Sequence, residues 1–308
     1  MACFRIVHRT EYLYNQPVRL GAHRLMLRPR ESHELKLLSH TITTTPPSTI
    51  SWAQDVFGNA IATATFDAPT DQLVIQSDAS LEHSSAAWPI FPIAANAINY
   101  PFSYSPQERT DLGALLSPQY DDPMGRLSSW TASFVRSNPT DTLALLKDLN
   151  AGITASATYQ AREDEGTQAP GSTLDLGRGS CRDFAVLFVE AARLLGFGAR
   201  IVSGYLFNPA LAGIDSTTHA WAEIFVPGAG WISFDPTNRQ MGSFNLIPVA
   251  VARDLAQAMP VSGSYLGPNG AQQRLMVAVR VTEQPEQNAS PCVPDTPFQS
   301  RYAGEASR

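Results

Sequence analysis

A change in the period of the hydrophobic residues near residue 124 limits the fold of this chain more than any other feature. Before that point, short stretches of strand-forming residues alternate with polar residues and are separated by turn residues such as Gly58-Asn59. This spacing is typical of an antiparallel β-rich domain. The strands expected there cover 3–14 (ended by Pro17), 24–28, 37–45, 49–56, 60–66 and 73–81.

Beyond residue 124 the apolar residues follow a helical period, and strands return later. Six prolines mark 86–123 as a connector, and 161–179 is polar and glycine-rich, which predicts a long loop. We therefore predict an α+β chain with a β-rich domain over 1–100, a core over 101–283 and a loose tail over 284–308. The helices expected in the core cover 127–135, 140–153 with Thr140 as N-cap, and 181–195; its strands cover 199–207, 219–226, 230–235 and 274–282.

Composition excludes several classes of function. Acidic residues outnumber basic ones, 28 to 22, which argues against nucleic-acid binding. No apolar run has the length of a membrane span, and the N-terminus lacks an apolar secretory signal. The three cysteines form no CxxC pair and no cluster with metal-ligand spacing. We therefore expect a cytoplasmic protein with no metal, no organic cofactor and no membrane partner, while its oligomeric state stays open.

Cys181 stands at the start of the clearest helix, in the segment GRGSCRDFAVLFVEAARLLG. Ser180 and Asp183 have the spacing of a capping box, and we interpret Asp183 as a cap acid. A thiol at a helix N-terminus is stabilised as thiolate by the helix dipole. Taken alone, Cys181 could equally be a small buried cysteine.

His219 is the only histidine after residue 83, and it begins the strand HAWAEIFV. The next strand, GWISFDP, carries Asp235. The order Cys, His, Asp is that of a thiol nucleophile, its base and the group that orients the base. We interpret Trp221 as a packing residue that flanks the site; because it shares the strand face of His219, a substrate-binding pocket wall is the alternative. Tyr159, before the long loop, is expected near the oxyanion, whose safest donor is the backbone N–H of Cys181.

The turn PGAG between the two strands gives a test of this assignment. A loop that leaves Val226 opposite Trp231 puts Asp235 on the wrong face for His219. A three-residue loop that pairs Val226 with Gly230 puts Asp235 opposite Trp221, within reach of His219. We predict the shorter loop or a glycine bulge.

These segments resemble bacterial transglutaminase-like enzymes, often described as cysteine proteases. The resemblance rests on GxCRDFA at 179–185, GARIVSGYL at 198–206 and THAWAEIFVPGAGWISFDPTN at 218–238, and more weakly on 249–261. The first 85 residues are similar to the N-terminal region that accompanies this family. The resemblance implies a papain-like core and assigns nucleophile, base and acid to Cys181, His219 and Asp235. At 252, 255 and 257 the chain departs from the family pattern, which affects substrate contacts more than the triad.

The expected chemistry is acyl transfer from a protein or peptide amide through a Cys181 thioester. Water as acceptor makes the enzyme a protease, deamidase or amidase, and an amine acceptor makes it a transglutaminase. We favour hydrolysis slightly, because water always competes and no motif indicates an amine site. A non-catalytic binding module on the same fold, and arylamine-type acetyl transfer, are the alternatives.

Overall fold

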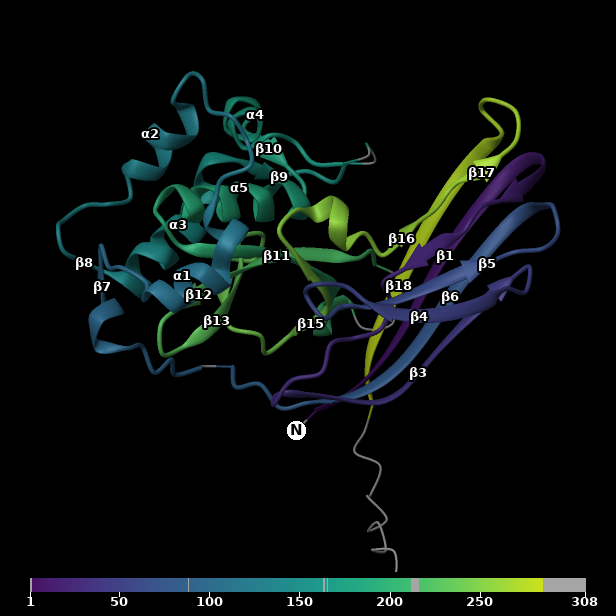
Figure 1. Ribbon diagram of the computed structural model, residues 1–308, viewed down its shortest axis with the longest axis horizontal. Coiled ribbons are helices and arrows are strands. Elements are labelled where there is room, and N and C mark those ends of the chain that lie inside the picture. The colour runs from purple at the N-terminus through teal and green to yellow at the C-terminus, as the bar shows by residue number, and fades with distance from the viewer. Residues whose placement is uncertain (1, 88, 163, 165, 212–215, 285–308) are drawn as a thin grey trace, which may run out of the picture.

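The computed structural model describes residues 2–87, 89–162, 164, 166–211 and 216–284. Apart from Gln284, the expected tail over 284–308 lies outside these residues. Two units stand side by side, a helix-covered unit and a unit made of strands (Figure 1). No helix in the described ranges is long and apolar enough to cross a membrane.

The β-rich unit is a sandwich of two antiparallel sheets. The long sheet has β1 at its centre, paired with β18 on one side and with β6 and then β3 on the other, while β17 pairs the end of β1. Its strands are β1 (Ala2–Leu20), β3 (Leu35–Thr45), β6 (Thr70–His83), β17 (Tyr265–Leu266) and β18 (Gln272–Gln284). The short sheet runs in the order β16 (Val261–Ser262), β2 (His23–Leu25), β5 (Ala60–Thr65) and β4 (Thr49–Gln54).

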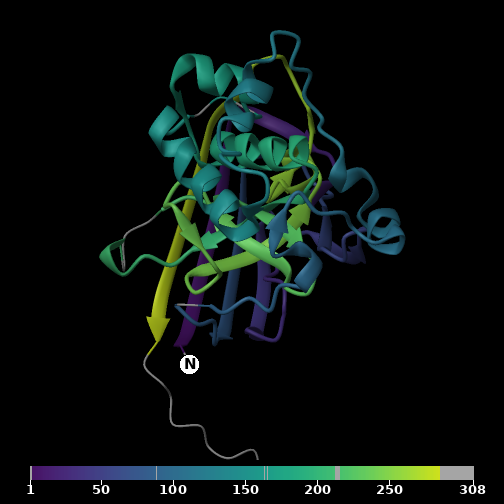
Figure 2. The ribbon, with the colours of Figure 1, turned by 90° about the vertical axis from the view of Figure 1, so that its left-hand side faces the viewer.

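Two sequence expectations about this unit need correction. Pro17 does not end the first strand, because it falls in an interruption of the β1–β6 ladder between Leu13 and Val18, where no ladder N–H is required. The strand expected over 274–282 is present as β18, but it pairs with β1 and not with the core sheet. Figure 2 shows the two strands running side by side. The β-rich unit is therefore built from both ends of the chain. The expected division, which assigned 101–283 to the core, placed the last strand in the wrong unit.

The core unit has a five-stranded antiparallel sheet with helix α5 (Cys181–Leu194) on one face. The sheet order is β14 (Gln240–Met241), β13 (Gly230–Asp235), β12 (His219–Val226), β11 (Gly198–Leu206) and β15 (Leu246–Ala252). The remaining helices are α1 (Pro106–Leu112), α2 (Arg126–Ala132), α3 (Thr142–Ser156) and α4 (Pro170–Leu176). Buried Phe184, Phe188 and Phe234 belong to the apolar cluster between α5 and the sheet. The predicted α+β class, a core of helices and an antiparallel sheet preceded by a β-rich region, is confirmed.

Two local expectations in the core were wrong. The N-cap of α3 is Asp141, which accepts from Ala144 N at 2.7 Å, while Thr140 belongs to the short strand β8 (Thr140–Asp141), paired with β7 (Asn99–Tyr100). The long polar loop contains the helix α4, with Pro170 in its first turn and Gly177 (φ +60°) as its C-cap. A short strand pair, β9 (Thr158–Tyr159) and β10 (Arg178–Gly179), closes that segment.

The two units pack through apolar clusters. In one of them Ile6 and Val279 of the long sheet meet Tyr205 and Ile247 of the core, and in another Met26 of the β-rich unit meets Ala250 of the core. In addition, Ser216 and Val279 exchange two backbone hydrogen bonds, at 2.7 and 2.8 Å. The segment that leads into β12 is thereby fixed to the C-terminal strand of the β-rich unit.

Candidate active site

Cys181 is the first residue of α5, and the local sequence explains why the helix begins there. Asp183 accepts hydrogen bonds from both the backbone N–H and the hydroxyl of Ser180, at 2.8 and 2.7 Å. Gly179 precedes the cap at a point where an added Cβ would lie 3.0 Å from the Cβ of Asp183. The capping box, and the close approach of the Gly179 backbone to Asp183, together place the thiol at the positive end of the helix dipole.

Asp183 also anchors the segment that runs past the thiol. Its fully buried carboxylate forms an ion pair with Arg162 at 2.7 Å and accepts from the backbone N–H of Gln168 at 2.7 Å. Burial alone raises the pKa of Asp183, but these donors outweigh it and lower the pKa. The interpretation of Asp183 as a cap acid agrees with its contacts, and the loop anchor is an additional role.

The β12–β13 hairpin has the predicted register. Val226 pairs with Gly230 across a three-residue loop, and Ala222 pairs with Phe234. Gly228 and Gly230 both have positive φ, +85° and +75°, which the tight turn requires. Asp235 therefore lies on the same strand face as His219.

His219 and Asp235 are in direct contact. Nε2 of His219 lies 2.8 Å from Oδ2 of Asp235, and both side chains are buried. Asp235 accepts further hydrogen bonds from the side-chain amide of Asn238 at 2.7 Å and from the backbone N–H of Thr237 at 3.0 Å. Asn238 was missed from the sequence, although DPTN is a typical side-chain-to-backbone turn.

Cys181 and His219 line the same cavity, and their side chains interact there. Burial raises the pKa of the Cys181 thiol. Hydrogen bonding to His219, the positive charge of His219 and a backbone hydrogen bond from Ala220 outweigh burial, so the pKa of Cys181 is lowered. Burial lowers the pKa of His219, but its hydrogen bonds to Asp235 and Cys181 raise it to about 10. Both directions favour a thiolate–imidazolium pair, with Nε2–H of His219 donating to Asp235.

A cavity of about 130 Å³ opens beside the thiol. Tyr159, half exposed, lines it, and its pKa is raised by burial and by the charge of Cys181. Val281 of β18 also lines it, so the β-rich unit supplies part of the wall. The remaining lining residues are Leu206, Asn208, Ser216, Thr217 and Thr218.

Trp221 lies behind His219 and not in this cavity. Its ring stacks on the imidazole with centroids 6.1 Å apart at 26°, and it packs with Val202, Leu246 and Val251. Only 1% of Trp221 is exposed. It therefore packs behind the imidazole, as expected of a residue that flanks the site, and it does not line the cavity beside the thiol.

The segment around 252–257, where the chain departs from the family pattern, is also distant from this cavity. Ala252 and Leu255 are buried in apolar clusters, and the carbonyl of Arg253 accepts from Arg193, near the C-terminal end of α5. No cluster of three or more metal-ligating side chains occurs within the described ranges.

Comparison with known proteins places both units in families. Residues 4–82 match the model of the bacterial transglutaminase-like N-terminal region, and residues 128–236 match that of the transglutaminase-like superfamily. The two models together match more than half of the chain.

Individual relatives agree with these matches. An uncharacterised protein of Mycobacterium tuberculosis is 29% identical over 279 residues, covering 84% of this chain and 86% of its own length. A protein-glutamine gamma-glutamyltransferase of Pseudomonas aeruginosa is 33% identical over 98 residues, covering 30% of this chain and 14% of its own length.

A solved structure, named "Putative Cysteine Protease from Cytophaga hutchinsonii", shares the fold of the whole chain. Its TM-score is 0.69 at 18% identity, covering 98% of this chain and 94% of the other. Residues 128–236 therefore belong to the transglutaminase-like superfamily, and residues 4–82 before them to the bacterial transglutaminase-like N-terminal region.

Proposed function

We propose that the protein is a cysteine-dependent acyl-transfer enzyme acting on amide bonds of proteins or peptides, with Cys181 as nucleophile, His219 as base and Asp235 as the orienting acid. The observation that carries this proposal is the alignment of three side chains beside an open cavity: His219 and Asp235 form a buried hydrogen-bonded pair, and the half-buried thiol of Cys181 interacts with His219.

The proposed reaction follows from the protonation states. The Cys181 thiolate attacks the substrate carbonyl carbon and forms a tetrahedral oxyanion. The N-terminus of α5 supplies backbone N–H groups to that oxyanion. His219 then donates its proton to the leaving amine or ammonia, the C–N bond breaks, and a Cys181 thioester remains. An incoming nucleophile loses a proton to neutral His219 and displaces the thiolate.

We propose water as the main acceptor, so that the net reaction is hydrolysis. Among the residues described around the cavity, the lining is hydroxyl, amide, aromatic and aliphatic, with no carboxylate to bind an approaching ammonium. The alternative is a protein-glutamine transglutaminase, which uses the same thioester. The P. aeruginosa relative that carries this activity in its name favours that alternative.

Incubation with glutamine-containing peptides and a labelled primary amine distinguishes the two acceptors. We expect ammonia release or peptide cleavage with little label incorporation, and no reaction in the Cys181→Ser variant. Abundant incorporation of the amine would replace hydrolysis by transamidation. The absence of both products, over a broad peptide pool, would contradict the acyl-transfer proposal.

A further inference from the structure

The cavity of about 130 Å³ beside the Cys181 thiol is lined by both polar and apolar side chains, and we call it the substrate cavity. Its polar lining carries one amide and three hydroxyl groups, from Asn208, Ser216, Thr217 and Thr218. Its apolar lining consists of Leu206 of the core, Val281 of the β-rich unit and the half-exposed ring of Tyr159. A hydrocarbon group next to the carbonyl that Cys181 attacks is therefore buried most favourably against these apolar side chains.

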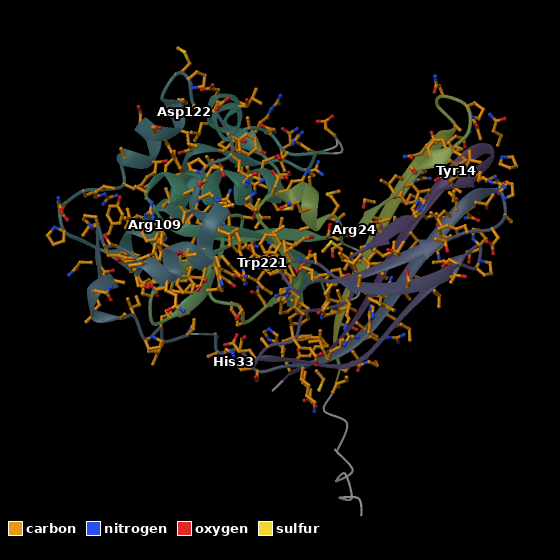
Figure 3. The ribbon with its side chains drawn as sticks, viewed as in Figure 1. Tyr14, Arg24, His33, Arg109, Asp122 and Trp221 are labelled. Atoms are coloured by element: carbon orange, nitrogen blue, oxygen red, sulfur yellow. The ribbon has the colours of Figure 1, made fainter. Side chains whose placement is uncertain are left out.

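Val281 brings the β-rich unit into the active site. It lies on β18 and pairs with Ile6 of β1 in the long sheet. Only 7% of Val281 is exposed, and it belongs to the apolar cluster that joins the two units, with Tyr205 and Ile247 of the core. Figure 3 shows side chains filling this junction, with Trp221 on its core side. The small exposed part of Val281 is thus a wall of the substrate cavity, and the rest is held in the contact between the units.

Both aliphatic side chains of this wall are anchored. Val279, two positions before Val281, exchanges two backbone hydrogen bonds with Ser216, at 2.7 and 2.8 Å. Leu206 is the last residue of β11 and pairs with Leu246 of β15. Because protein interiors are close-packed, neither side chain can move back without breaking contacts of its own unit. The wall therefore acts as a stop for a group that enters beside the thiol.

The volume of the substrate cavity limits what it can enclose. A cavity of about 150 Å³ holds one benzene molecule, so this volume encloses roughly five or six non-hydrogen atoms. A butyryl group is of this size, whereas a hexanoyl group has two more carbons. The longer chain must either displace the aliphatic wall or leave part of its length outside the cavity, and in both cases it gains less from burial.

We propose that Val281 and Leu206 limit the size of the acyl group that Cys181 accepts, so that the β-rich unit takes part in selecting the substrate. The favoured acyl groups are uncharged and about as long as a butyryl group, because the described lining carries no charged side chain besides the catalytic pair. This inference rests on the acyl-transfer function proposed above and refines it. Val281 acts on specificity and takes no part in the chemical step.

The p-nitrophenyl esters of short fatty acids test the size limit on the full-length chain, because the leaving group stays the same while the acyl chain changes. The Cys181 thiolate attacks the ester carbonyl, a C–S bond replaces the C–O bond, and p-nitrophenolate leaves; water then hydrolyses the thioester. We measure the second-order rate constant of p-nitrophenolate release from the acetate, butyrate, hexanoate and octanoate, less the rate of Cys181→Ser. We expect the constant to be highest for butyrate and at least about tenfold lower for hexanoate.

Variants of the wall should change the preferred chain length. Val281→Ala removes two methyl groups, and we expect the hexanoate-to-butyrate ratio of rate constants to rise about tenfold. Val281→Phe extends the wall and should lower the butyrate-to-acetate ratio. Leu206→Ala enlarges the cavity from the core side, so it provides the test if Val281→Ala does not fold. The matched control is Val279→Ala, because Val279 is buried in the same cluster but does not line the cavity; this variant should keep the ratios of the parent.

The outcomes separate this inference from the acyl-transfer function. Equal chain-length ratios in the parent, Val281→Ala and Leu206→Ala would overturn the size limit alone. The same holds for a rate constant that rises steadily from acetate to octanoate in the parent, or for a change in Val279→Ala as large as that in Val281→Ala. If no ester reacts above the Cys181→Ser rate while iodoacetamide still alkylates Cys181 faster than Cys3, only the size limit is wrong. If Cys181 is also no more reactive than Cys3, both proposals are wrong.

Discussion

The reactivity of Cys181 depends on one neighbour, His219. Burial of the thiol raises the pKa of Cys181, and only the contacts with His219 and with the Ala220 backbone lower it. We therefore expect His219→Ala to raise the thiol pKa and to slow alkylation by iodoacetamide at neutral pH about tenfold for each unit of pKa. Catalytic turnover should fall by about 10³-fold or more, with the circular dichroism spectrum unchanged.

Cys3 is the internal control for that experiment, because it lies on β1 in the β-rich unit, remote in the fold from His219. Peptide mass spectrometry separates the alkylation rates of the two thiols in one sample. If Cys181 reacts no faster than Cys3 in the parent chain, or equally fast after His219→Ala, the assignment of Cys181 and His219 as a catalytic pair is wrong.

Asn238 acts one step further from the chemistry, as a positioning residue. Its side-chain amide donates to Asp235 Oδ2, the oxygen that also faces His219. Asn238→Ala removes one charge-assisted hydrogen bond from a fully buried carboxylate. We expect kcat/KM to fall about 10–100-fold and the alkaline limb of the pH profile to move below pH 10, because a less firmly held Asp235 supports the protonated imidazole less.

Thr237→Val is the matched control for Asn238→Ala. Thr237 bonds Asp235 through its backbone N–H, which valine retains, and its hydroxyl has no hydrogen-bond partner in the described part of the chain. A fall in activity without a shift of the alkaline limb in Asn238→Ala would indicate a merely structural role.

At the scale of elements, local sequence signals predicted those parts of the site that depend on local spacing. The start of α5, the β12–β13 register and the face shared by His219 and Asp235 follow from the capping box, the PGAG turn and strand alternation. The helix α4 was missed because its Pro170 and Gly177 were interpreted as loop residues, although proline at N1 and glycine at the C-cap also bound helices. Strand alternation placed Trp221 on the face of His219 but could not decide between packing behind the imidazole and lining the substrate cavity, because it gives a face and not a neighbour.

The ion pair between Arg162 and Asp183 fixes the loop before α4 to the first turn of α5, beside the thiol. Arg162→Gln removes the cation from the buried Asp183 carboxylate, which keeps its hydrogen bonds from Gln168 and Ser180, so we expect the free energy of unfolding in urea to fall by about 1–3 kcal/mol. A double-mutant cycle with Asp183→Asn should recover most of this as coupling energy. The matched control is Arg126→Gln, whose exposed pair with Asp175 should contribute less than about 1 kcal/mol. Equal effects of the two arginine substitutions would contradict the anchoring role.

At the scale of the whole molecule, the β-rich unit helps to build the site. Its strand β18 supplies Val281 to the wall of the substrate cavity and binds Ser216, three residues before His219. The β1–β18 pairing joins residues some 270 positions apart, which no local pattern encodes. This explains why the sequence could predict a β-rich region and a core, but not that the last strand of the chain returns to the first.

The junction of the two units contains a histidine that makes their association sensitive to acid. His8 of β1 is 1% exposed; its Nδ1 lies 3.1 Å from the Tyr205 hydroxyl of the core and its Nε2 2.9 Å from the Thr10 hydroxyl. Burial lowers the pKa of His8 to about 4. Since the unfolded chain binds a proton near pH 6.5 and the folded chain only near pH 4, His8 makes the protein less stable as the pH falls through this window.

On acidification from pH 6.5 to pH 4, we expect the titration of His8 to lower the free energy of unfolding by about 3 kcal/mol, measured in urea. His40, whose pKa burial also lowers to about 4, adds a slope of the same sign within the β-rich unit, so the informative quantity is the difference between the parent and His8→Gln. Glutamine keeps hydrogen-bonding groups but cannot titrate, and the variant should lose less stability on acidification than the parent. Parallel pH curves for the two proteins would show that His8 does not titrate at this junction, whereas a smaller loss of stability in His8→Gln than in the parent between pH 6.5 and pH 4 would identify it as the group that weakens the contact between the two units.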